Sequence, residues 1–160
     1  MVYIGAFTVA LVTLLLWRGY SSYLASELEC CRELLVALED MRDKVRCFLM
    51  TPREWAHSYS SDLLEGCGFL GALKDGESPE RAYEKCRYKL PVRSDADEVV
   101  TNLFRRAGGA DLVAEVGAIG IAVDKLSAIE SAMSADIGKR VKAAGAMLGA
   151  FAAGIVILVI

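Results

Sequence analysis

The sequence is poor in the residues from which metal and thiol sites are built. Its one histidine, His57, has its nearest cysteines ten residues away on either side, so no zinc-binding spacing is present. Its five cysteines are odd in number and show no CxxC pattern, which argues against a disulfide framework or a thiol redox motif. These cysteines are Cys30, Cys31, Cys47, Cys67 and Cys86. We therefore predict no metal site and interpret the cysteines as reduced, mostly core residues.

Motifs of catalysis and cofactor binding are also missing. Neither a Walker loop nor a GxSxG nucleophile turn occurs. Gly66, Gly68 and Gly71 match a dinucleotide-fingerprint spacing, but they lie at the end of a predicted helix and do not open one. The net charge of −3, without a basic cluster beyond the predicted membrane flank, disfavours nucleic acid as a partner. We predict no catalytic residue, no cofactor and no enzymatic activity.

Charged side chains are absent from both ends of the chain. Residues 1–17 and 143–160 carry none, and all 18 Lys/Arg and 21 Asp/Glu lie between Arg18 and Lys142. An 18-residue helix rises about 27 Å, close to the roughly 30 Å hydrocarbon core of a bilayer. The pattern predicts transmembrane helices over 1–17 and 143–160. A cleaved secretory signal is the alternative for the first segment, but no cation precedes it and no small-x-small cleavage site follows.

The positive charges predict the orientation of the central segment, 18–142. Arg18 follows the first apolar segment, and Lys139, Arg140 and Lys142 precede the second. Cations flank membrane spans on the cytoplasmic side. We expect a two-pass membrane protein in contact with lipid, with 18–142 as one cytoplasmic domain.

Apolar residues recur every three or four positions in two long stretches, which predicts two long helices. The first stretch covers residues 20–50 with Leu24, Leu28, Cys31, Leu35, Leu38, Met41, Val45 and Phe48. The second starts at Asp111 with Leu112, Val116, Ile119, Val123, Leu126, Ile129, Met133, Ile137 and Val141. Neither contains proline, so each can run into its apolar chain end.

Start signals predict three shorter helices between the long ones. Thr51-Pro-Arg-Glu54 reads as a capping box for a helix whose apolar side is Trp55, Tyr59, Leu63, Cys67 and Leu70. Ser78-Pro79 opens another, and Ser94 or Asp95 starts the last, which Gly108-Gly109 closes. The predicted fold is all-α: a bundle of about five helices, of which the two long ones are antiparallel and adjoin the terminal transmembrane helices.

Two groups of residues are candidates for protein contacts. Gly145, Gly149 and Gly154 form a small-residue side of the second apolar segment, suited either to packing against Ala6 and Ala10 or to self-association. Four charged residues at one end of the bundle form a candidate docking edge for another protein. They are Arg105, Arg106, Asp111 and Glu115.

The whole-chain pattern resembles the stage III sporulation protein AB family. The segments that carry the resemblance are Arg32-x-x-Leu35-x-x-Leu38-x-x-Met41, Phe48-Leu-Met-Thr-Pro52, Gly76-x-x-x-x-Arg-Ala-Tyr83, Gly108-Gly109-Ala-Asp111 and Lys139-Arg-Val-Lys-Ala-Ala-Gly-Ala-Met-Leu-Gly149 before an Ile/Val/Leu tail. The chain departs from the family at Lys44-Val45, at Glu115 where a Gln is usual, and at Ala143-Ala-Gly-Ala146.

The resemblance implies a helical domain similar to the platform (F) proteins of type II secretion and type IV pilus machines. Such a protein would sit in the mother-cell membrane facing the forespore, and would couple a secretion-type ATPase to other small membrane proteins of a channel complex. The alternative is a self-associating structural membrane coiled-coil protein without a motor partner. A transporter subunit is disfavoured because neither predicted span has an ionisable side chain.

Overall fold

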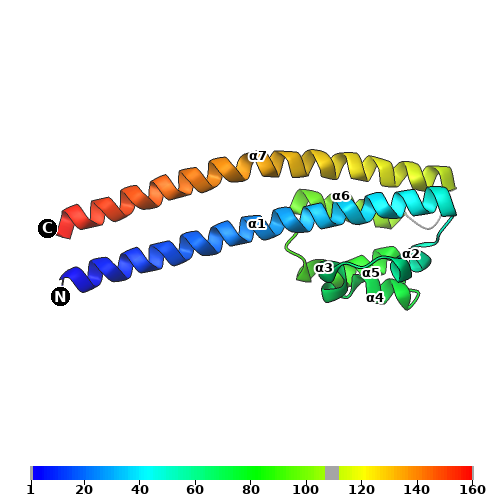
Figure 1. Ribbon diagram of the computed structural model, residues 1–160, viewed down its shortest axis with the longest axis horizontal. Helices are drawn as coiled ribbons and strands as arrows, with labels where there is room; N and C mark the ends of the chain where they lie inside the picture. The colour runs from blue at the N-terminus through cyan, green and yellow to red at the C-terminus, as the bar shows by residue number, and fades with distance from the viewer. Residues whose placement is uncertain (1, 107–111, 160) are drawn as a thin grey trace. The chain divides into compact units, whose positions relative to one another are not determined.

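The protein is all-helical in a computed structural model that describes the backbone of residues 2–106 and 112–159 (Figure 1). Side chains are described for residues 11–106 and 113–150 and for Gly154. The elements are α1 (Val2–Phe48), α2 (Pro52–Ser58), α3 (Asp62–Cys67), α4 (Phe69–Lys74), α5 (Pro79–Cys86), the 3₁₀ helix η1 (Arg87–Lys89), α6 (Ser94–Arg106) and α7 (Leu112–Val159). The predicted all-α class is confirmed, with seven α-helices over this part of the chain in place of about five.

The chain divides into two compact units. The terminal unit comprises Met1–Ser26 and Ala132–Ile160, and the bundle unit comprises Glu27–Ser131. The long helices α1 and α7 contribute to both, since each is continuous through its border. The predicted domain borders, after residues 17 and 142, fall inside the terminal unit and stay predictions.

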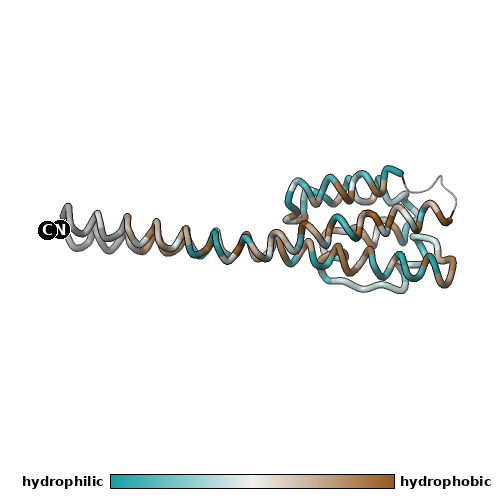
Figure 2. The backbone as a smooth tube through the Cα atoms, turned by 90° about the horizontal axis from the view of Figure 1, so that it is seen from above, coloured by the Kyte–Doolittle hydropathy of each residue, from teal (hydrophilic) through white to brown (hydrophobic). Residues whose placement is uncertain are grey.

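The long helices carry the expected apolar stripes, and Figure 2 shows hydrophobic and hydrophilic positions alternating along the helices of the bundle unit. On α1, Cys31, Leu38, Met41 and Val45 are buried as predicted. Phe48 is an exception: it is 71% exposed, so its predicted burial is wrong. The helix ends at this residue, and the next backbone position, Leu49, turns into the left-handed region with φ 55°.

Three short helices replace the single helix predicted after Thr51. The chain leaves helical geometry at Tyr59, and the Ser61 side chain then caps α3 by accepting a hydrogen bond from the Leu64 amide. Gly68 adopts φ 95°, which ends α3 and allows α4 to begin. The restart shifts the buried face from Leu63, which is half-buried, to Leu64.

Polar contacts fasten α2 and α3 to α1. The Trp55 indole Nε1 donates to the Asp40 carboxylate at 2.8 Å, and Lys44 Nζ lies 3.0 Å from the same carboxylate. The Ser61 hydroxyl donates to Glu33 at 2.8 Å. Because both carboxylates belong to α1, these contacts fix how the short helices sit on the long one.

An aromatic cluster joins α4, α5 and α6. The rings of Phe69, Tyr83 and Phe104 lie 5.5 to 6.2 Å apart, and all three are buried. The Tyr83 hydroxyl donates to Asp97 at 2.9 Å, and Arg87 pairs with the same carboxylate at 2.8 Å. The three packed rings thus form the apolar core between α4, α5 and α6, and the polar contacts of Asp97 border it.

The predicted capping box at the start of α2 is confirmed. The Thr51 hydroxyl accepts from the Glu54 amide at 3.3 Å, and the Glu54 carboxylate accepts from the Thr51 amide at 2.8 Å. We expect Thr51→Ala to lower the free energy of unfolding by about 1 kcal/mol, the usual loss of an N-cap hydroxyl. Urea unfolding of the full chain in mild detergent measures it. Thr51→Ser keeps the hydroxyl as a control, and equal losses in both variants would contradict the assignment.

In the terminal unit, α1 and α7 run antiparallel. A side-chain hydrogen bond joins Tyr20 to Arg140, whose Nε also lies 2.5 Å from Asp136. Further along, the Trp17 indole faces Gly145. No helix in the described part of the chain carries a stretch long and apolar enough to cross a membrane. The predicted spans 1–17 and 143–160 lie partly outside the residues whose side chains are described.

Candidate docking groove

The bundle unit has a groove of about 600 Å³ between α6 and α7. Two stripes with helical three-and-four spacing form its walls. The stripe on α6 consists of Asp95, Glu98, Val99, Asn102, Leu103 and Arg106. The stripe on α7 consists of Ala114, Gly117, Ala118, Ile121, Ala122 and Lys125. The groove therefore has an apolar middle and ionisable groups toward its ends.

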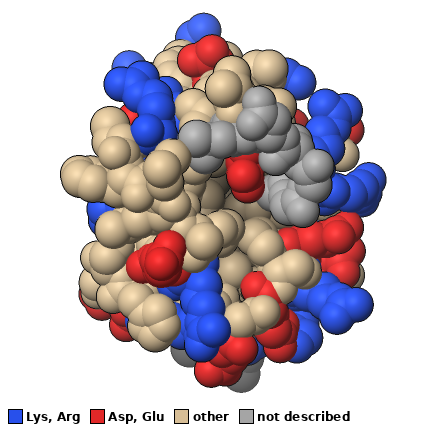
Figure 3. All heavy atoms as spheres, turned by 90° about the vertical axis from the view of Figure 1, so that its right-hand side faces the viewer, with Lys and Arg blue, Asp and Glu red and all other residues tan. Residues whose placement is uncertain are grey.

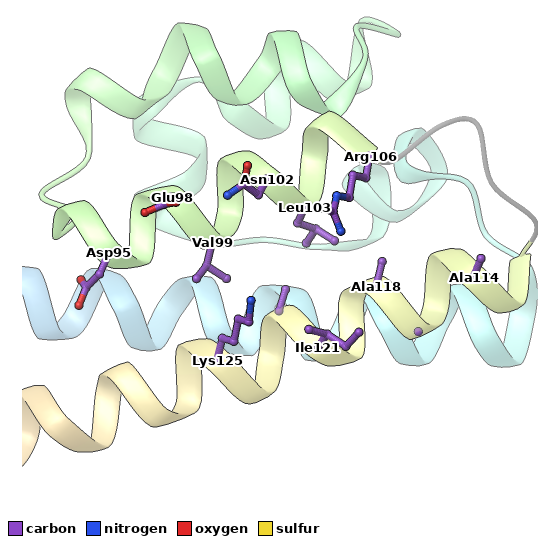
Figure 4. A pocket seen from close by; sticks show the side chains of 12 residues that line it. Asp95, Glu98, Val99, Asn102, Leu103, Arg106, Ala114, Ala118, Ile121 and Lys125 are labelled. Carbon is purple, nitrogen blue, oxygen red and sulfur yellow. The ribbon is translucent and has the colours of Figure 1, made fainter.

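The α6 wall of the groove is positioned by the buried apolar face of this helix. Ala96, Val100 and Phe104 are fully buried on the other edge of the helix and hold it in the core. Val99, on the edge toward α7, is half-buried. Figure 4 shows Val99 and Arg106 pointing from α6 toward α7.

The opposite wall on α7 is built from small residues and one large apolar side chain. Ala114, Gly117 and Ala118 leave the helix surface low, and a Cβ added at Gly117 would meet no described atom within 4 Å. Ile121 is 60% exposed, although it lies in the middle of a stripe of the groove. Lys125 points from α7 toward α6 (Figure 4). The groove is therefore open to solvent at Ile121.

Three of the four ionisable groups in the groove have no ion-pair partner among the described residues. Arg93 binds both carboxylate oxygens of Asp95, and this hydrogen bonding lowers the pKa of Asp95. Glu98, Arg106 and Lys125 form no such contact within the described residues. The unpaired groups comprise two cations and one anion, which leaves an excess of positive charge.

The described residues of the predicted docking edge lie in different surroundings. Arg106 lines the groove, whereas Arg105 does not and lies 3.9 Å from Glu80 of α5. Glu115 is half-buried on α7 outside the groove lining, and Asp111 lies outside the described residues. Their joint role stays a prediction. Residues such as Asn102 and Lys125 were missed because their spacing is equally typical of a solvated helix face.

The three glycines predicted to pack the second apolar segment lie in different surroundings. A Cβ at Gly145 would lie 3.9 Å from the Trp17 indole nitrogen. At Gly149 and Gly154 it would meet no atom of the described residues within 4 Å. Their role in packing the second apolar segment, either against the first segment or against another molecule, stays a prediction.

The cysteine thiols are a second candidate for a functional site. Cys30, Cys31, Cys67 and Cys86 are buried and free, and Cys47 is exposed. A hydrogen bond between Cys67 and Cys86 lowers the pKa of Cys67 and raises that of Cys86. Among the described residues, no group of three or more His, Cys, Asp or Glu side chains is placed to hold a metal ion. His57 is exposed on α2.

Figure 3 shows basic and acidic side chains interspersed on one face of the molecule, without a continuous patch of either sign. The groove therefore remains the best candidate site, because it combines a concave shape with ionisable groups that have no ion-pair partner among the described residues.

Comparison of the chain with protein-family profiles, curated proteins and solved structures finds no match.

Proposed function

We propose that this protein is a non-catalytic membrane scaffold of a sporulation channel complex that resembles a secretion machine. It would couple a cytoplasmic secretion-type ATPase to other small membrane proteins during endospore formation. The observation that carries the proposal is the continuity of α1 and α7, which are unbroken over 47 and 48 residues. Each helix runs from a charge-free chain end into the helical bundle that carries the polar surface.

The membrane location rests on the charge pattern of the sequence. Uncharged segments 1–17 and 143–160 would form two transmembrane helices, and the cations that flank them would keep the bundle unit in the cytoplasm. With the resemblance to stage III sporulation protein AB, this membrane would be that of the mother cell facing the forespore. Lipid is then a partner of both chain ends.

A docking role for the bundle unit is supported by its surface chemistry. It offers an open groove with unpaired charges, which suits recognition of another protein. The work of such a complex would have to come from a partner that hydrolyses nucleotide.

A second candidate is a self-associating structural membrane protein without a motor partner. It is favoured by the surroundings of Gly149 and Gly154, since a Cβ at either glycine would meet no described atom within 4 Å and a second helix backbone could approach closely there. Bulky replacements at these glycines distinguish the two functions, because they would abolish self-association but leave ATPase docking intact.

The proposed function predicts which proteins accompany the full-length chain. We expect a gentle-detergent pull-down, with the protein tagged at native level in its host during starvation, to recover a secretion-type ATPase and small membrane proteins. An untagged strain is the control for non-specific capture. Recovery of the chain alone, even after cross-linking, would contradict the scaffold and favour self-association.

A further inference from the structure

We infer that the groove between α6 and α7 binds one amphipathic helix of the cytoplasmic partner, with a carboxylate of that helix beside Arg106. This inference rests on the proposed function and specifies its docking site. The occupant's chemistry follows from the length of the groove, its lining and its unpaired charges.

The length and shape of the groove suit a helix of about three turns. The lining runs from Asp95 to Arg106 on α6 and from Ala114 to Lys125 on α7, which at the helical rise is about 16 Å on each wall. The low surface at Gly117 and Ala118 lets another backbone come close. A helix lying in a groove between two helices is a standard mode of peptide recognition.

The lining also selects the side chains of the occupant. Val99, Leu103 and Ile121 form an apolar middle and call for an apolar stripe at i, i+3/i+4 and i+7. Arg106, at one end, has no ion-pair partner within the described residues, and a guanidinium binds a carboxylate in a two-pronged geometry. The partner helix should therefore carry an aspartate or glutamate one turn beyond its apolar stripe.

Other occupants fit the groove less well. A second copy related by a two-fold axis would place one concave surface against an identical one, which leaves the groove unfilled. A small molecule would need an enclosed site, usually with aromatic lining. This groove is open at Ile121, and none of its lining residues is aromatic.

Paired variants of the full chain test the inference. Ile121→Glu is matched by Val36→Glu, since both are exposed aliphatic residues inside long helices, 60% and 54% exposed. Arg106→Glu is matched by Arg46→Glu, because both arginines are exposed and in the last turn of a helix. We expect at least a tenfold loss of co-purified ATPase for the two groove variants and less than twofold for the controls. Circular dichroism of the four variants checks that each remains folded.

A photo-cross-linking amino acid at Ile121, with Val36 again as control, identifies the occupant. We expect cross-links from position 121 to map to one amphipathic helix of the ATPase, and an acidic-to-Arg change in that helix to restore binding of Arg106→Glu. Cross-links to a second copy, or undiminished ATPase recovery by the groove variants, would overturn the groove assignment while leaving the scaffold intact. Absence of the ATPase from the wild-type pull-down would overturn the proposed function and this inference together.

Discussion

Trp55→Ala is expected to lower the free energy of unfolding of the helical bundle by about 4 kcal/mol, the usual loss for a large aromatic residue in a core. Trp55 is 1% exposed and stacks on Tyr59 at 4.9 Å between ring centroids. Its removal leaves a cavity between α1 and α2 that the surrounding helices fill only in part. Most small domains are stable by only about 5–15 kcal/mol, so much of the stability depends on this side chain.

The hydrogen bond of Trp55 adds a smaller part, which a second variant isolates. Trp55→Phe keeps most of the buried ring but removes the donor to Asp40, and we expect a loss of about 1.5 kcal/mol. Asp40 keeps Lys44 as its partner at 3.0 Å, so the carboxylate is not left uncompensated.

Urea unfolding of the full chain in detergent, followed by circular dichroism, measures both changes. His57→Ala is the matched control, since His57 is exposed on the same helix, and its effect should stay within about 0.5 kcal/mol. A loss for Trp55→Ala no larger than that of the control would mean that α2 does not pack on α1 as described.

The sequence predicted the helices that have either a long, uninterrupted apolar spacing or a clear start signal. α1 and α7 follow from uninterrupted three-and-four spacing, and α2 and α5 from Ser/Thr–Pro start signals that the structure confirms. Three short helices after Thr51 were not separable by apolar spacing alone. A polar cap at Ser61 and a left-handed Gly68 divide them, and the same apolar residues would equally suit one helix.

The groove was predictable only at Arg106. Its other wall comes from α7, and contact between two separate helices depends on how both pack on the core, which spacing within each helix does not determine. Ile121 lies off the predicted apolar stripe of α7, so the sequence alone places it on a solvated face. It is 60% exposed, and its place in the lining of the groove requires the tertiary structure.

Alkaline pH is expected to destabilise the bundle by about 5 kcal/mol between pH 9 and pH 11 through Cys30 and Cys31 alone. Burial raises the pKa of Cys30 to about 12 and that of Cys31 to about 11. In the unfolded chain these thiols ionise near pH 8.5. Above about pH 9 the unfolded state has therefore released protons that the native state still holds, so unfolding becomes more favourable as pH rises. Each such proton contributes about 1.4 kcal/mol per pH unit.

Two other groups define the pH window of this effect. The lowered pKa of Cys67 stabilises the fold progressively as pH rises toward 9 and adds no slope above it. Burial also raises the pKa of the Tyr83 phenol, so Tyr83 steepens the loss only above about pH 10, where an unfolded tyrosine ionises. Between pH 9 and 10 the slope should thus report mainly on the buried thiols, including Cys86, whose pKa is raised as well.

Urea unfolding at several pH values under reducing conditions measures the slope. Cys30→Ala removes one of the protons, and the slope of its unfolding free energy between pH 9 and 10 should be smaller by about 1.4 kcal/mol per pH unit. Cys47→Ala, at the exposed cysteine, should keep the wild-type slope. The slope is informative even where Cys30→Ala lowers stability at every pH, because a packing loss shifts the curve without tilting it. Equal slopes in the two variants would show that Cys30 ionises as readily in the fold as in the unfolded chain, which its 0% exposure beside Cys31 and Glu33 argues against.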